Sequence, residues 1–142
     1  MIQPILASVI NARWAPDVVP PPYDSLTAQE REVHLEQHVH SFLHVTRSAE
    51  ASHGHPTEHV RLAVEGNSAL SNLITAGAYT PLTEERLFLQ KIEAEGVTQR
   101  SIIGSIDLAE VSLMPHEAVH QGRVQALAAH FRQARSMSSP VV

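Results

Sequence analysis

A histidine beside a carboxylate is the pair of residues in this chain best suited to proton transfer. His116 and Glu117 follow Met114-Pro115 in a segment without hydrophobic periodicity, and we expect that segment to be a loop. Loops positioned by a rigid scaffold often carry catalytic groups, and adjacent imidazole and carboxylate groups can transfer a proton or orient a ligand. The alternative is an ordinary turn with an exposed His–Glu pair. We assign His116 and Glu117 as the candidate catalytic residues.

Two further motifs could bind a substrate. Val19-Pro20-Pro21-Pro22-Tyr23-Asp24 has a stiff backbone, because each proline fixes φ and lacks a donor, and it ends on a phenol and a carboxylate. Ser41-Phe42-Leu43-His44-Val45-Thr46-Arg47 supplies an imidazole and a guanidinium that could hold a phosphate or carboxylate. The candidate ligand-binding residues are therefore Tyr23, Asp24, His44 and Arg47. A structural turn at Tyr23-Asp24 and a surface ion pair at Arg47 remain the alternatives.

The chain holds ten histidines, which is many for 142 residues. His34 and His38 are four residues apart on an expected helix and would share one face. Further histidines follow at His40, His44, His53, His55 and His59. Imidazole suits zinc, copper or nickel, but the chain has no His-Glu-x-x-His pattern, and a solvated histidine-rich surface is the simpler interpretation. We assign no metal site, and the cofactors stay unknown.

The composition excludes several classes of protein. The absence of cysteine rules out disulfides, thiolate catalysis and iron–sulfur clusters. A net charge of −5 argues against a nucleic-acid partner, and no segment approaches the roughly 20 apolar residues that would cross a bilayer. The N-terminus lacks the basic region of a signal peptide, so we expect a cytoplasmic protein without membrane contact.

The N-terminal half predicts alternating short elements. We expect a strand over residues 5–10, a proline-rich connection over 15–25, and a helix over 28–38 that opens with a Thr27–Glu30 capping box. A strand should follow over 41–46. A longer helix should then begin near Thr57 and end at Gly77, with an apolar face of Val60, Ala63, Val64, Leu70, Leu73 and Ile74.

The C-terminal half predicts a hairpin and a last helix. Leu87–Ile92 is typical of a strand, although a short helix is an alternative, and Gly96 makes a turn toward a second β-rich segment over 101–107. A loop over 112–122 leads to an amphipathic helix marked by Val124, Leu127, Ala128 and Phe131, and Pro140-Val141-Val142 looks like the opening of another strand. The fold class is therefore α+β: a single domain over residues 1–142, with a mixed or antiparallel sheet and two to three packed helices.

The order of these motifs resembles a known family. Pro21-Pro22-Tyr23-Asp24, the Ser41–Arg47 segment, Pro115-His116-Glu117 and the Arg135–Pro140 region are similar, in this order, to motifs of the domain-of-unknown-function 1015 family. Members often carry Arg-Thr after Pro-His-Glu, where this chain has Ala118-Val119. They are also longer, so the chain resembles the N-terminal portion of a divergent or truncated member.

Two functions are consistent with these observations. The first is an enzyme domain that binds a small phosphate- or carboxylate-bearing ligand, with nucleotide-dependent phosphoryl transfer as one conceivable reaction. The second is a non-catalytic binding or assembly module that has lost the site of its relatives. A truncated chain ending on an unpaired strand edge would favour association, so a homo-oligomer is one expected partner. The expected partner is a small anionic ligand, and whether the chain is an enzyme stays open.

Overall fold

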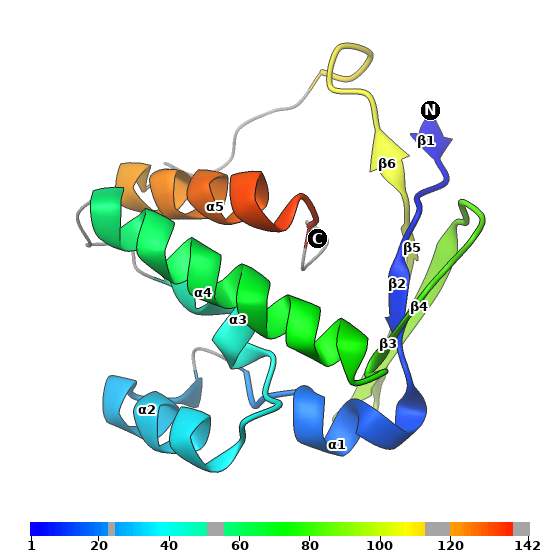
Figure 1. The fold of residues 1–142 in the computed structure, drawn as a ribbon. Helices are drawn as coiled ribbons and strands as arrows, with labels where there is room; N and C mark the ends of the chain where they lie inside the picture. Colours follow the sequence, from blue (N-terminus) through cyan, green and yellow to red (C-terminus); the bar gives the residue numbers. More distant parts are fainter. Residues whose placement is uncertain (23–24, 51–55, 113–119, 138–142) are drawn as a thin grey trace. The chain divides into compact units, whose positions relative to one another are not determined.

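The computed structural model describes residues 1–22, 25–50, 56–112 and 120–137, and it confirms an α+β fold (Figure 1). The described helices are η1 Ala12–Trp14, α1 Ala15–Val18, α2 Ala28–Gln37, α3 Leu43–Glu50, α4 Pro56–Thr75 and α5 Gln121–Ala134. The described strands are β1 Ile2–Gln3, β2 Ser8–Ile10, β3 Tyr79–Pro81, β4 Phe88–Ala94, β5 Val97–Ile103 and β6 Ser105–Ile106. The strands form three two-stranded pairings, β1 with β6, β2 with β3 and β4 with β5.

The chain divides into two compact units. One comprises residues 10–80 and 118–141 and contains the helices. The other comprises residues 1–9 and 81–117 and contains most of the strands. The expectation of a single domain stays a prediction. No helix in the described part of the chain is long and apolar enough to cross a membrane.

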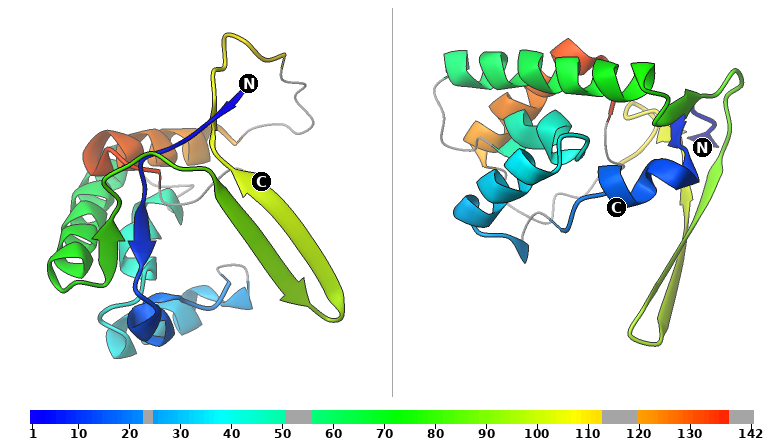
Figure 2. Two further views of the ribbon diagram at one scale, coloured as in Figure 1. Left: turned by 90° about the vertical axis from the view of Figure 1, so that its right-hand side faces the viewer. Right: turned by 60° about the horizontal axis from the view of Figure 1, so that its bottom comes forward.

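The helical unit is built on three helices that pack against one another. In Figures 1 and 2, α5 lies beside the long helix α4, and α3 contacts both. Val18, Val45, Leu73 and Ala78 form a buried cluster at one end of these helices. A backbone hydrogen bond of 2.8 Å from Phe42 N–H to the Val18 carbonyl joins α1 to the segment that enters α3. Burial of these apolar side chains stabilises the unit.

Local signals set the ends of two helices as predicted. The Thr27 hydroxyl accepts the Glu30 N–H at 3.3 Å, and the Glu30 carboxylate accepts the Thr27 N–H at 2.7 Å, which confirms the capping box at the start of α2. α4 begins at Pro56 rather than after a Thr57 cap, because proline at the first helical position loses only an N–H that has no partner there. Gly77, at a φ of 78°, ends α4 as predicted.

The segment over residues 41–46 is not a strand, so that prediction was wrong. Leu43–Glu50 is helix α3, and the Ser41 hydroxyl oxygen accepts the Leu43 N–H at 3.4 Å where the helix starts. The Val45 and Thr46 side chains favour a strand locally. Packing of α3 against both α4 and α5 overrides that preference, and in a short apolar run the hydrophobic pattern does not distinguish a strand from a helix.

The apolar faces of the last two helices also differ from the prediction. Ala63 and Leu73 are buried as predicted, but Val60, Val64 and Ile74 are exposed on α4. On α5, Val124 and Phe131 are exposed; the buried residues are Ala126, Ala129 and His130. Ala63, Ala126 and Ala129 are small buried residues on these faces, and small residues let helix backbones approach closely. A β-carbon on Gly66 of α4 would collide with the Val45 carbonyl oxygen of α3.

In the strand-rich unit the predicted hairpin is confirmed. β4 and β5 pair antiparallel, with Phe88 opposite Ile103 and Ala94 opposite Val97. The two residues between them, Glu95 and Gly96, have φ of 51° and 80°, as a type I′ turn requires. The first predicted strand is interrupted instead of continuous. Within residues 5–10, Ile5 forms only a single bridge to Arg86, and strand β2 covers only Ser8–Ile10.

Candidate functional site

A cleft of about 360 Å³ lies within the helical unit, between the start of α3 and the second half of α4. Its lining is Val39, His40, Ser41, His44, Val64, Glu65, Ser68, Ala69, Asn72 and Leu73. The volume is at the small end of the range for ligand pockets, which favours a molecule of metabolite size. The walls contain both apolar side chains and polar groups. The cleft therefore offers both contact area and hydrogen bonds.

His44 is held firmly at the edge of this cleft. Its Nε2 atom lies 3.2 Å from the Leu35 carbonyl oxygen and 3.2 Å from the His38 carbonyl oxygen, both at the C-terminal end of α2. Carbonyl oxygens only accept hydrogen bonds, so Nε2 carries the proton and donates to them. The Nδ1 atom is then the ring nitrogen left for a ligand. The contact also ties α3 to the end of α2.

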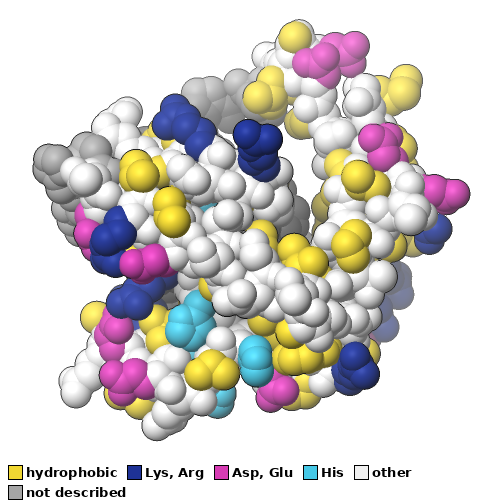
Figure 3. All heavy atoms as spheres, in the orientation of Figure 1, with side chains coloured by type: hydrophobic (Ala, Val, Ile, Leu, Met, Phe, Trp, Pro, Cys, Tyr) yellow, Lys and Arg dark blue, Asp and Glu magenta, His cyan; other side chains and the backbone are white. Residues whose placement is uncertain are grey.

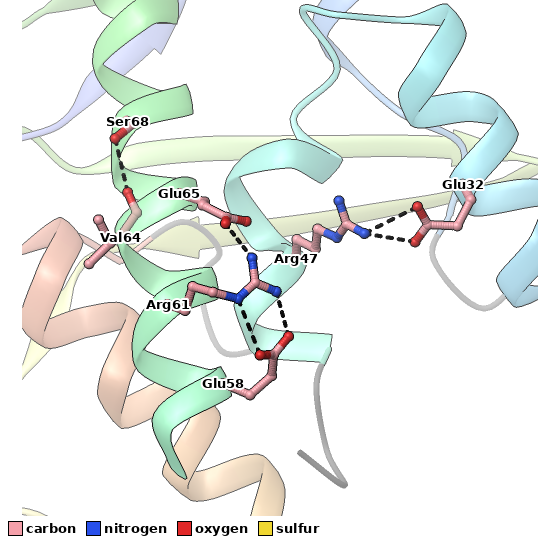
Figure 4. Close-up of polar contacts among 7 residues, drawn as sticks. All are labelled: Glu32, Arg47, Glu58, Arg61, Val64, Glu65 and Ser68. Carbon is pink, nitrogen blue, oxygen red and sulfur yellow. Dashed lines mark hydrogen bonds and ion pairs between the residues drawn. The ribbon is translucent and has the colours of Figure 1, made fainter. Parts of the chain in front are cut away.

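Arg47 is engaged by a carboxylate on α2. One of its terminal nitrogens lies 3.0 Å and 3.1 Å from the two oxygens of Glu32 (Figure 4). The Arg47 side chain is 41% exposed and that of Glu32 is 60% exposed, so this is a surface ion pair of modest energy. Arg47 is not among the residues that line the cleft. The surface ion pair, one of the two alternatives for Arg47, is therefore present in the structure.

A second charged group lies on α4 beside this pair. The Arg61 guanidinium is placed between Glu58 and Glu65, and its Nε donates to Glu58 Oε2 at 3.2 Å (Figure 4). That hydrogen bond holds the pKa of the Glu58 carboxyl below its ordinary value. Glu65 lines the cleft and pairs with Arg61, which also pairs with Glu58, so this cluster of one guanidinium and two carboxylates is net negative.

Histidines gather around α2 and the start of α3 (Figure 3). The rings of His34 and His38 stack with centroids 4.3 Å apart, and His40 meets the Trp14 ring edge-on at 5.1 Å. Loss of hydration lowers the pKa of His34, and the nearby His38 and His44 lower it further. Among the described residues, no group of three histidines or carboxylates is arranged to hold a metal ion. His53 and His55 lie outside the described residues.

Ser41 and His34 form a hydroxyl–imidazole contact next to the cleft that resembles a nucleophile with its base. Ser41 Oγ lies 3.0 Å from His34 Nε2, within the distance that proton transfer requires. However, the Ser41 side chain is only 1% exposed, and its oxygen also accepts a backbone N–H from Leu43. A substrate could not reach such a hydroxyl without local opening. The contact therefore serves to fix the corner between α2 and α3.

The structure places the predicted site residues in different environments. It brings His44 to the cleft, while Arg47, one helical turn further on, is directed at Glu32. The predicted ligand-binding residues Tyr23 and Asp24 and the predicted catalytic residues His116 and Glu117 lie outside the described residues. Their roles stay predictions.

Sequence reasoning missed three polar residues of the cleft wall. Glu65, Ser68 and Asn72 lie on α4 at spacings of three and four residues, so they share one face of the helix. This polar stripe could have been found from the sequence, but it looks like an ordinary solvated face. His59, also on α4, is buried, and neither ring nitrogen has a hydrogen-bond partner in the described part of the chain.

An α+β fold with a small polar cleft describes a class of protein and no particular activity. Comparison with protein-family models identifies the family: residues 2–142 match the family described as protein of unknown function, DUF1015. The chain belongs to this family. Searches of curated proteins and of solved structures find no significant match to it.

Proposed function

We propose that this protein binds a small molecule bearing a carboxylate or phosphate group, and that the cleft between α3 and α4 is its binding site. The rigidly held imidazole of His44 carries this proposal. Because Nε2 is committed to two carbonyl oxygens of α2, the ring is already oriented before a ligand arrives. Preorganised groups lose less entropy on binding and so contribute more to affinity.

The positive charge for an anion would come from imidazoles. Arg47 and Arg61 are each paired with carboxylates, whereas His40 and His44 line the cleft directly. Because Nε2 of His44 donates to carbonyl oxygens, Nδ1 donates to an anion only when the ring carries both protons.

A catalysed reaction would require further residues beyond those that bind the ligand. The predicted catalytic pair, His116 and Glu117, would have to approach a ligand in this cleft within hydrogen-bond reach. Phosphoryl transfer from a nucleotide stays an expectation from the sequence, and it requires that these two residues reach the ligand. The binding proposal does not depend on it.

Thermal unfolding in the presence of ligands tests the proposal. Inorganic phosphate, O-phosphoserine and ATP are the probes. A ligand at about 100 times its dissociation constant should stabilise the folded state by about 2.7 kcal/mol. Stabilisation by at least one of the three probes supports the proposal, and a flat response to all three contradicts it.

A further inference from the structure

The β4–β5 ribbon has an open edge with a specific pattern of charge. In the described part of the chain, β4 and β5 pair only with each other, over seven residues in each strand. Figures 1 and 2 show them as a long two-stranded ribbon. Leu89 is 85% exposed and Ile92 is 45% exposed on β4. An isolated two-stranded ribbon is only marginally stable, and an open strand edge is a template for another strand.

The register determines which backbone groups face the open edge of β4. A type I′ turn closes on a hydrogen-bonded pair, here Ala94 with Val97. Because hydrogen-bonded and non-hydrogen-bonded pairs alternate in an antiparallel ladder, Ile92 also directs its N–H and C=O toward β5. Lys91 and Glu93 therefore direct their backbone N–H and C=O groups toward the open edge. The open edge thus offers backbone donors and acceptors beside one cation and one anion.

We propose that the open edge of β4 binds a second copy of this chain, with the two β4 strands antiparallel about a two-fold axis at Ile92. In this register Lys91 of each copy lies opposite Glu93 of the other. Both residues have outward-facing backbone groups, so each such pair also exchanges backbone hydrogen bonds. The result is a four-stranded sheet in the order β5, β4, β4 of the second copy, β5 of the second copy.

Charge selects this register from the alternatives. A two-fold axis at Lys91 would place two ammonium groups opposite each other, and an axis at Glu93 would place two carboxylates opposite each other. Like charges directly opposite in a sheet are destabilising. Within one copy, Lys91 Nζ already lies 2.6 Å from Glu93 Oε1, so both side chains lie on one face of the strand. In the paired sheet the four charges alternate in sign.

The other edge of the ribbon does not offer the same complementarity. The outward-facing residues of β5 are Thr98, Arg100 and Ile102, by the same alternation. Arg100 is the only charge among them, so no two-fold pairing along β5 brings opposite charges together. The net charge of −5 on each copy opposes association, and the contact is short. The dimer should therefore be weak and dependent on protein concentration.

Sedimentation equilibrium of the full chain over a range of concentrations, with charge exchange, tests the register. The wild-type chain should show a monomer–dimer equilibrium. Lys91→Glu and Glu93→Lys should each weaken it at least about tenfold, because each places like charges opposite each other twice. The double variant K91E/E93K should restore the wild-type equilibrium. A wild-type chain that stays monomeric, or single variants that dimerise as well as wild type, would overturn the proposal.

Proline substitution tests which edge is used. Lys91→Pro removes an outward N–H from β4 without removing a hydrogen bond of the ribbon, and it should abolish the dimer. Arg100→Pro makes the matched change on the outer edge of β5 and should leave the dimer intact. Far-ultraviolet circular dichroism checks that both variants keep their fold. A dimer that survives Lys91→Pro but not Arg100→Pro would show that the wrong edge was chosen.

Discussion

The Nε2 atom of His34 and the hydroxyl oxygen of Ser41 lie 3.0 Å apart, and this hydrogen bond joins α2 to the residues that lead into α3. Leu35 is the only buried residue of α2, so side-chain contacts hold much of this helix in place. Two further side-chain contacts join α2 to α3. His44 donates to carbonyl oxygens at the end of α2, and Arg47 pairs with Glu32. His34 is a titratable group with a lowered pKa, and salt weakens the exposed ion pair of Arg47 and Glu32. The attachment of α2 should therefore respond to solution conditions.

Stability should fall as pH decreases below neutrality. The pKa values of His34 and His130 are lowered from the ordinary 6.5, in both cases chiefly because burial disfavours the charged form. The unfolded chain then binds more protons than the folded chain below that value. The stabilising effect is complete above about pH 6.5 and is lost as pH falls toward the lowered values. Urea unfolding at about pH 7.5 and about pH 5.5 measures it, and greater stability at the lower pH would contradict this prediction.

Gly66→Ala should destabilise the protein although alanine favours helices. At an unhindered helical position this change would stabilise by about 1 kcal/mol. Here the new β-carbon would collide with the Val45 carbonyl oxygen, and relief of such overpacking typically costs about 1–3 kcal/mol. Ser71→Ala, at an exposed position of the same helix, is the control and should be close to neutral. Chemical denaturation gives both values; a gain in stability for Gly66→Ala would show that α3 and α4 are not so close.

Thr27→Ala should cost about 1 kcal/mol of stability. The substitution removes the hydroxyl that accepts the Glu30 N–H at the start of α2. Gln29→Ala, two residues on and exposed, makes a control that keeps the cap. Thermal unfolding of both variants measures the difference. Equal stability of the two would mean that the capping box does not hold α2 in solution.

Arg47→Ala distinguishes two accounts of anion binding. The sequence makes Arg47 a candidate ligand-binding residue, and in that role its loss should abolish stabilisation by phosphate. The cleft proposal predicts that phosphate still stabilises the variant, because Arg47 is paired with Glu32 and does not line the cleft. The variant itself should lose less than about 1 kcal/mol of stability, as for other exposed ion pairs. Thermal unfolding with and without phosphate decides between them.

The sequence predicted the features that depend on local signals. The capping box at Thr27 and Glu30, the helix end at Gly77 and the turn at Glu95-Gly96 each follow from a few adjacent residues. The predictions that were wrong concern features that depend on contacts between distant segments. Residues 43–46 are part of helix α3 because this segment packs against α4 and α5, which no local pattern reveals.

The same limit applies to the site. Val64 of α4 was predicted to face the core, yet it is exposed and lines the cleft. The small residue Gly66 lies on the buried face instead, because close packing on α3 leaves no room for a side chain. His44 was found because its residue type suggested chemistry. Ser68 and Asn72 were missed because polar residues on a helix are ordinarily solvated.

One pair of variants tests the cleft as the binding site most directly. Ser68 and Ser71 are exposed residues of α4 whose hydroxyls each donate to the carbonyl four residues earlier, at 3.0 Å and 2.9 Å. Only Ser68 of the two lines the cleft. Phenylalanine at either position removes the same hydrogen bond, but at Ser68 it also fills the cleft. The two variants are therefore closely matched.

The measurement is the thermal stabilisation of each variant by O-phosphoserine and by inorganic phosphate at about pH 6. Ser71→Phe should keep the stabilisation seen for the wild-type chain, and Ser68→Phe should lose it while its unliganded unfolding temperature stays close to that of Ser71→Phe. Equal stabilisation of both variants would contradict the assignment of the cleft as the ligand site.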